Sequence, residues 1–149
     1  MTFKKIIVYL ILIFAGIQLF PVNMNQSDKV PESDFLKYFN SSDSIANILK
    51  ISCYDCHSNN TNYPWYNSIQ PVAFMLEDHI TEGKSELNFS EFTDYSKRKQ
   101  RSKINSMISQ IEDDEMPLFS YTIIHRDAIL SDENKKLLIR YFESIKDSL

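Results

Sequence analysis

The chain is 149 residues long and carries 16 basic and 20 acidic residues, which gives a net charge of −4 at pH 7. Without Lys4 and Lys5, 14 basic residues face 20 acidic ones, and this negative excess argues against nucleic acid as a partner. Only two glycines and five prolines occur, and no segment alternates like a strand, so the composition disfavours a hairpin-rich fold and favours an all-α one.

Residues 1–22 have the pattern of an export signal or a membrane anchor. Lys4 and Lys5 precede an apolar run from Ile6 to Phe20, which is about as long as the core of a signal peptide and short for a membrane span. No cleavage site of the A-x-A type follows, which favours an uncleaved anchor over a removed signal. In either case we expect the two lysines to stay cytoplasmic and the rest of the chain to be exported.

Residues 23–33 are polar and contain Pro31, so we expect a linker there. Residues 34–149 then form one small domain. Its first elements are predicted to be a short helix at 35–39 and a helical segment at 42–50, whose apolar residues are spaced for one buried face. The second segment leads directly into the most informative motif of the chain.

That motif is Cys53-Tyr54-Asp55-Cys56-His57, the C-x-x-C-H pattern that attaches a c-type haem. Two thiols three residues apart lie on one face of a helical turn, so both can reach the vinyl groups of one porphyrin. His57 follows directly, and its imidazole can ligate the iron. The motif uses both cysteines of the chain and occurs once, so we expect one covalent haem c.

Three other uses of the cysteine pair stay open. A redox dithiol of this kind would open a helix in a βαβ unit, which the sequence lacks. A structural disulfide closing so short a loop would remove little chain entropy. A zinc site needs four ligands, and only His57, His79 and His125 could complete it.

Three aromatic residues follow the motif after a polar loop: Tyr63, Trp65 and Tyr66. We expect them to line the haem pocket, although ordinary core packing would explain three aromatic residues here too. Trp65 is the only tryptophan of the chain.

A helix is predicted from Pro71 to Glu82, because proline suits a first helical position and Gly83 suits a C-terminal cap. The apolar residues that this helix is expected to bury are Val72, Met75, Leu76 and Ile80.

Two longer helices are predicted in the second half of the chain, over 95–111 and from Ser131 to Ile145. The first begins with a basic cluster: Lys97, Arg98, Lys99, Arg101 and Lys103. This cluster is more typical of a solvated helix face than of a docking patch or a partner for a haem propionate.

Met116 is the preferred sixth ligand of the iron. Its thioether is a soft ligand, and Pro117 restricts Met116 to an extended backbone, which places it in a loop rather than a helix. His79 and His125 are the alternatives, and an open or water-bound site is a further one. Met75 and Met107 lie in apolar stripes and are expected to be core filler.

The chain resembles the bacterial haem-binding domain family, a relative of monohaem c-type cytochromes. The resemblance spans about residues 35–146 and is carried by several short motifs: Cys53 to Asn59, Tyr63 to Tyr66, Pro71-Val72, Leu87 to Phe92, Met116 to Leu118 with Tyr121 and His125, and Leu130-Ser131. It implies covalent haem at Cys53 and Cys56, His57 as proximal ligand and, as in c-type cytochromes, Met116 as distal ligand. One departure is that small cytochromes c cross their terminal helices at a glycine and an aromatic. Here the only glycines are Gly16 and Gly83, so that crossing must be built differently.

These observations predict a small c-type cytochrome-like helical domain, wrapped around one haem and preceded by an apolar signal or anchor helix. The expected function is electron transfer on the periplasmic side of the inner membrane, without enzymatic activity, between redox partner proteins that the sequence does not identify. The alternative is a module that binds or senses a gas or peroxide at an open or weakly ligated iron.

Overall fold

The computed structural model describes residues 2–27 and 29–149, and these residues form helices and loops without a β-strand. The all-α prediction is therefore confirmed. In chain order the elements are α1 (Phe3–Ile17), α2 (Phe35–Tyr38), α3 (Asp43–Leu49), η1 (Lys50–Tyr54), α4 (Asp55–His57), η2 (Trp65–Ser68), α5 (Val72–Glu86), η3 (Phe89–Asp94), α6 (Lys97–Glu112), α7 (Phe119–Thr122), η4 (Arg126–Ala128) and α8 (Asp132–Ser148).

Short polar side chains cap four of the eight α-helices among the described residues. Asp34 accepts from the backbone N–H groups of α2, Ser42 caps α3, Ser96 caps α6 and Ser131 caps α8. Each cap satisfies a backbone donor that has no partner inside its own helix. The predicted starts of α2 and α8 are confirmed.

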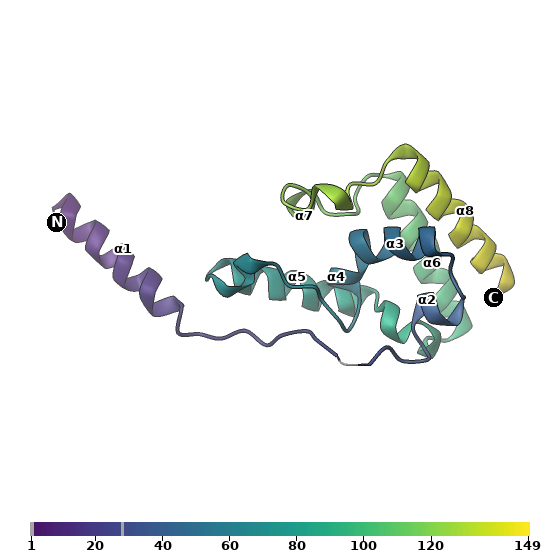
Figure 1. The fold of residues 1–149 in the computed structure, drawn as a ribbon, viewed down its shortest axis with the longest axis horizontal. Helices are drawn as coiled ribbons and strands as arrows, with labels where there is room; N and C mark the ends of the chain where they lie inside the picture. Colours follow the sequence, from purple (N-terminus) through teal and green to yellow (C-terminus); the bar gives the residue numbers. More distant parts are fainter. Residues whose placement is uncertain (1, 28) are drawn as a thin grey trace.

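The hydrophobic core lies between α2, α3, α6 and α8, at the end of the domain that holds the C-terminus (Figure 1). Phe35 is fully buried at its centre and contacts Phe89, Phe92 and Phe142 edge-on. Helices α6 and α8 pack against each other through apolar residues recurring every three or four positions. This end is a rigid support against which the cysteine motif is packed.

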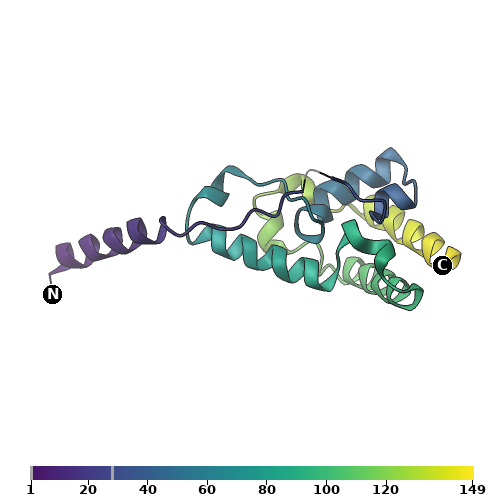
Figure 2. The same ribbon diagram turned by 90° about the horizontal axis from the view of Figure 1, so that it is seen from below.

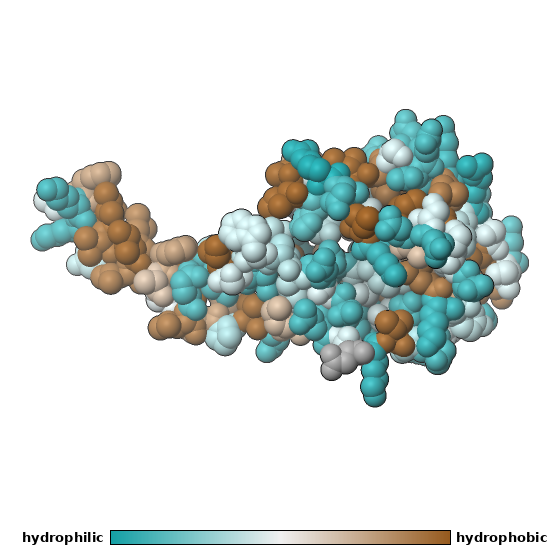
Figure 3. All heavy atoms as spheres, viewed as in Figure 1, coloured by the Kyte–Doolittle hydropathy of each residue, from teal (hydrophilic) through white to brown (hydrophobic). Residues whose placement is uncertain are grey.

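Helix α1 stands apart from the other helices, at the opposite end of the molecule from the C-terminus (Figure 1 and Figure 2). Its surface is almost entirely apolar, as the brown spheres of Figure 3 show, and none of its residues is buried. Within the described residues, no helix is both long and apolar enough to cross a membrane.

The segment after α1 is held against the domain. The Gln18 side chain donates to the Gln70 carbonyl at 3.2 Å and accepts from the Gln70 N–H at 2.9 Å. Asn25 bonds to Tyr63, Ser58, Thr61 and Lys84. The predicted linker is therefore hydrogen-bonded to the loop after the cysteine motif and to α5.

Helix α5 differs from its prediction in its buried face and its end. Ala73 and Ile80 are buried, whereas Val72 and Met75 are 40% and 60% exposed. The helix continues to Glu86, so Gly83 lies inside it and is not its C-terminal cap. The physical reason is close packing, because small residues let α5 approach α4. The spacing of large apolar residues does not reveal which face of a helix has this property.

Candidate functional site

The two cysteines lie at the end of one continuous helical stretch made of α3, η1 and α4. Residues Lys50–Tyr54 form a π-helical turn, a distortion that occurs often at functional sites. Both thiols are free and half-buried. The helical turn predicted for the C-x-x-C-H motif is present.

His57 is oriented by two backbone carbonyls of α5 and the residue that follows it. Its Nδ1 lies 2.8 Å from the Gly83 oxygen and 3.1 Å from the Leu87 oxygen. Because carbonyl oxygens only accept hydrogen bonds, Nδ1 carries the hydrogen and Nε2 is left free with its lone pair. Burial lowers the pKa of His57, which keeps the ring neutral. This is the arrangement by which proteins fix a metal-ligating imidazole.

Gly83 makes this contact possible. A Cβ at position 83 would lie 2.8 Å from the Cys56 carbonyl oxygen, a distance that side chains essentially never adopt. The missing side chain lets α5 approach α4 closely enough for His57 to reach the Gly83 carbonyl.

Two adjoining cavities open beside the motif and share five lining residues: Ser52, Cys53, His57, Glu86 and Met116. The first cavity has a volume of about 340 Å³ and reaches into the core. Its apolar lining comes from Leu87, Phe89, Met107, Ile111 and Phe142. The second cavity, of about 200 Å³, lies between α5 and the loop before α7 and adds Cys56, His79 and Tyr121. Both thiols and the imidazole therefore face connected, largely apolar space.

The thiols are unlike those of a redox dithiol. Burial raises the pKa of Cys53 to about 12, and burial together with the Asp55 charge raises the pKa of Cys56 to about 11. Reactive thiols need the opposite shift, because the thiolate is the nucleophile. Nor do three His, Cys, Asp or Glu side chains gather anywhere in residues 2–27 and 29–149 as a metal cluster would require.

Of the three candidates for the opposite ligand, Met116 and His79 lie near His57. Met116 lies in a loop after α6, as predicted, and lines both cavities. His79 lines the second cavity only. The structure places His125 elsewhere: its Nε2 accepts from the Tyr66 hydroxyl at 2.7 Å, and its ring stacks on Tyr121.

The three aromatic residues expected around the haem do not belong to the described lining of either cavity. Tyr63 donates to Glu77 and accepts from Asn25, and Tyr66 bonds to His125. Trp65 is 79% exposed. The physical reason is the polar loop 58–62, which turns the chain away from the cavities after His57 and holds it by hydrogen bonds of Ser58 and Thr61.

The aromatic ring that does lie beside His57 is Phe89, edge-on at 6.5 Å between ring centres. Phe89 also stacks on Tyr54, which follows Cys53 in the motif. Of the five basic residues at the start of α6, only Lys103 lines a cavity, with Glu86 at 3.7 Å. Nothing in their local spacing distinguishes Phe89 from a core residue or Lys103 from its solvated neighbours.

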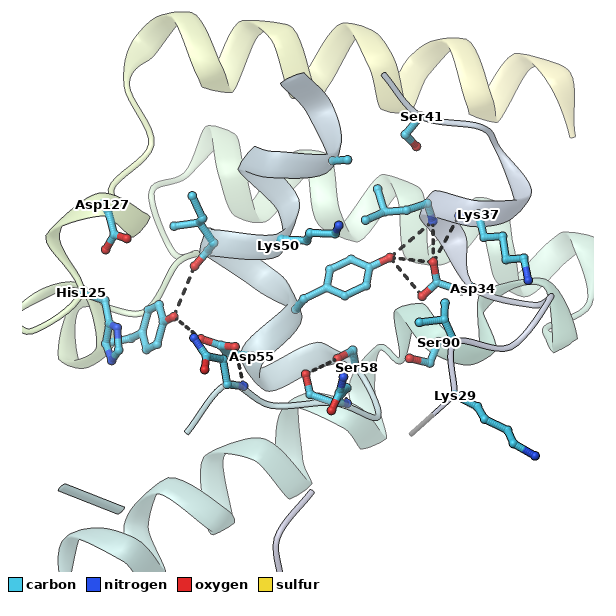
Figure 4. Close-up of a pocket in the computed structure, with 18 residues that line it drawn as sticks. Lys29, Asp34, Lys37, Ser41, Lys50, Asp55, Ser58, Ser90, His125 and Asp127 are labelled. Atoms are coloured by element: carbon cyan, nitrogen blue, oxygen red, sulfur yellow. Dashed lines mark hydrogen bonds between the residues drawn. The ribbon is translucent and has the colours of Figure 1, made fainter. Parts of the chain in front are cut away.

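A third, larger depression of about 740 Å³ lies on the other side of the motif helix (Figure 4). It is lined by charged and polar residues, among them Lys37, Lys50, Asp34 and Asp55. Neither cysteine nor His57 is among its described lining residues. This polar groove does not suit an apolar ring attached to the two thiols.

Comparison with known proteins gives one match. A family model described as "Haem-binding domain" matches residues 12–144, which include the end of α1, the linker and nearly the whole domain. No curated protein and no solved structure matches the chain.

Proposed function

The chain belongs to the haem-binding domain family, and from this premise we propose that it carries one covalent haem c and transfers electrons. The proposed attachment is by thioether bonds from Cys53 and Cys56, with Nε2 of His57 as an axial ligand. The observation that carries this proposal is the position of His57: two carbonyls accept from its Nδ1–H, and the ring lines the second cavity together with both cysteines.

The residues around the cavities suit this group. The first cavity offers a largely apolar surface to one side of the group. Met116 supplies a thioether for the second axial position, and Lys103 offers a positive charge to a propionate carboxylate. When bound, the haem supplies a one-electron couple between ferrous and ferric iron.

We further propose that the protein is an electron carrier rather than an enzyme. Its proposed place is the periplasmic side of the inner membrane, attached through the N-terminal segment or released after cleavage, where redox proteins exchange electrons with it. The support is the apolar α1, which carries Lys4 and Lys5 near its start, together with the C-x-x-C-H motif, since covalent haem attachment in bacteria is an extracytoplasmic reaction.

The first test is an optical spectrum of the exported protein, produced with cytochrome c maturation factors, oxidised and then reduced. We expect sharp c-type bands and, in the oxidised form, a weak near-infrared band from sulfur-to-iron charge transfer. Haem bands without the sulfur band would move the sixth ligand to His79, His125 or an open site. A colourless protein would overturn the proposal.

Met116→Ala tests the axial thioether. We expect the reduction potential to fall by roughly 100 mV or more, within the ~0.8 V range over which axial ligands tune haem. The near-infrared band should vanish, and carbon monoxide should bind the reduced variant. The control is Met75→Ala, because Met75 is a 60% exposed methionine on α5. An unchanged potential in Met116→Ala would contradict the ligand assignment, and rapid carbon monoxide binding to the unaltered protein would favour a sensing role.

A further inference from the structure

One end of the domain exposes a group of large apolar side chains that the proposed function does not use. They come from η2 with the start of α5 and from the segment around α7: Trp65, Ile69, Val72, Phe74, Met75, Phe119, Ile123 and Ile124. The hydrogen bond from Tyr66 to His125 ties the two segments together. We call these eight residues the apolar end. Several large apolar side chains exposed at one end of a domain indicate an interaction surface.

The sequence segments that form the apolar end also contain no charged residue. Residues 56–76 and 116–124 contain no Asp, Glu, Lys or Arg, and neither do residues 6–27. Every charged residue therefore lies outside these three segments, and Lys4 and Lys5 come directly before the first of them. The absence of charge matters because moving a charged side chain out of water costs far more than moving an apolar one.

Helix α1 leaves the domain from this same end (Figure 1 and Figure 2). The two-way pairing of Gln18 with Gln70 joins its C-terminal end to the turn between η2 and α5, in the middle of the apolar end. Gln70 is buried and also donates to the Phe20 carbonyl, so these polar groups satisfy one another. Figure 3 shows the apolar surface of α1 and a further apolar area on the side of α7 nearest to it.

We propose that the apolar end lies on a lipid bilayer, with α1 inserted beside it, so that the domain sits on the membrane surface in one fixed orientation. This inference rests on the proposed membrane attachment through α1 and not on the bound haem. A helix of 15 residues is about 22 Å long, less than the ~30 Å of a hydrocarbon core. An inserted α1 therefore brings Gln18 and its partner Gln70 down to the acyl boundary.

The chemistry of the apolar end fits the interfacial region of a bilayer. Trp65 is exposed there, and tryptophan prefers this region because its ring is apolar while its N–H can still bond to water or a headgroup. Phe119 is equally exposed, and Ile123 and Ile124 follow it on the same segment. Shallow insertion of such side chains is how peripheral proteins hold an orientation on a membrane.

Trp65, as the only tryptophan, reports on this contact in the full-length, haem-loaded protein. The protein is bound to vesicles of equal parts phosphatidylethanolamine and phosphatidylglycerol, and binding is verified by flotation. We expect Trp65 emission to move to shorter wavelength and to be quenched when the lipids carry bromine near the top of their acyl chains. The Trp65 emission is compared between brominated and plain vesicles, because quenching by any other group is the same on both.

The matched control moves the reporter to the other end of the domain. Tyr38 on α2 is 55% exposed, and a Trp65→Phe/Tyr38→Trp double variant should float equally well but show no quenching by the brominated lipid. Protein that floats while Trp65 stays unquenched would overturn the proposal and leave a protein partner as the occupant. Protein that does not float would also overturn it. Failure of the proposed haem function appears separately, as missing haem bands.

Discussion

At the scale of single residues, the site depends on one glycine. Gly83→Ala should reduce the free energy of unfolding by about 1–3 kcal/mol, because the atom it meets is the fixed Cys56 carbonyl, which cannot swing away as a side chain would. The same displacement should lengthen the His57 bond to the Gly83 carbonyl and lower the yield of haem-loaded protein. Urea unfolding and the ratio of haem absorbance to protein measure the two effects.

Gly16→Ala is the control for this variant, since nothing among the described residues lies within 4 Å of an added Cβ there. Alanine favours a helix over glycine by roughly 0.5–1 kcal/mol, so Gly16→Ala should be neutral or slightly stabilising. Equal stability of the two variants would mean that α5 does not need its close approach to α4.

Tyr121 bears on the proposed potential through Asp55. Its hydroxyl donates to the Asp55 carboxylate at 2.8 Å, and burial together with that bond raises the pKa of Tyr121, so it stays a donor. Tyr121→Phe removes the donor, so the negative charge of the Asp55 carboxylate near Cys56 is less compensated. The potential should fall, because added negative charge favours ferric iron. A redox titration measures the shift.

Tyr141→Phe is the comparison for Tyr121→Phe, since Tyr141 is also half-buried but bonds to Ser41 in the core region. Its potential should match that of the unaltered protein. Equal potentials in all three proteins would show that Asp55 does not act on the iron.

How far the sequence predicts the site differs from residue to residue. Cys53, Cys56 and His57 follow from their spacing alone, because positions i, i+3 and i+4 of a helical stretch lie on one face. Phe89, Lys103 and Asn25 could not be found in this way. Each reaches the motif from a segment distant in sequence, and a local pattern gives no signal for such a contact.

At the scale of elements, the linker after α1 acts as part of the domain. The Asn25 side chain donates to Ser58 and Thr61 and accepts from Lys84. Asn25→Ala leaves three partners unsatisfied and should cost about 1–3 kcal/mol of unfolding free energy. Amide hydrogen exchange should rise in residues 58–63, just after His57. Asn23→Ala, at an exposed position two residues earlier, should change neither quantity, and equal exchange in both variants would contradict the role of Asn25.

Helix α5 shows why elements are predicted more reliably than their buried faces. Its existence and start follow from the sequence, but its packing depends on Ala73, Ile80 and Gly83, which are spaced seven and three residues apart on one face. Two of these three residues, Ala73 and Gly83, are small. They allow α5 to approach its neighbours closely and bury little apolar area themselves. A pattern of large apolar residues instead selects Val72 and Met75, which belong to the exposed apolar end.

At the scale of the whole molecule, the candidate site and the core are one continuous structure. The first cavity is lined by Met107, Ile111 and Phe142, which are also members of the main hydrophobic cluster. Space beside such residues deprives them of packing contacts, and a ring that fills it restores them. A haem bound there would complete the core from one side, whereas Phe35, Phe39 and Phe92 pack together without lining either cavity.

We therefore expect haem loading to stabilise the protein, and to do so more in the parts that line the cavities than in the rest of the core. Protein made without maturation factors should melt at a lower temperature than the loaded protein and exchange amide hydrogens faster in α6 and in residues 113–118. Exchange around Phe35 should change least, because that part of the core lies outside both cavities. A Cys53→Ala/Cys56→Ala variant made with the factors should behave like the unloaded protein, which separates the effect of haem from that of expression. If loaded and unloaded proteins melted together, the two cavities would have to be ordinary packing defects, and the proposed site would have to lie elsewhere.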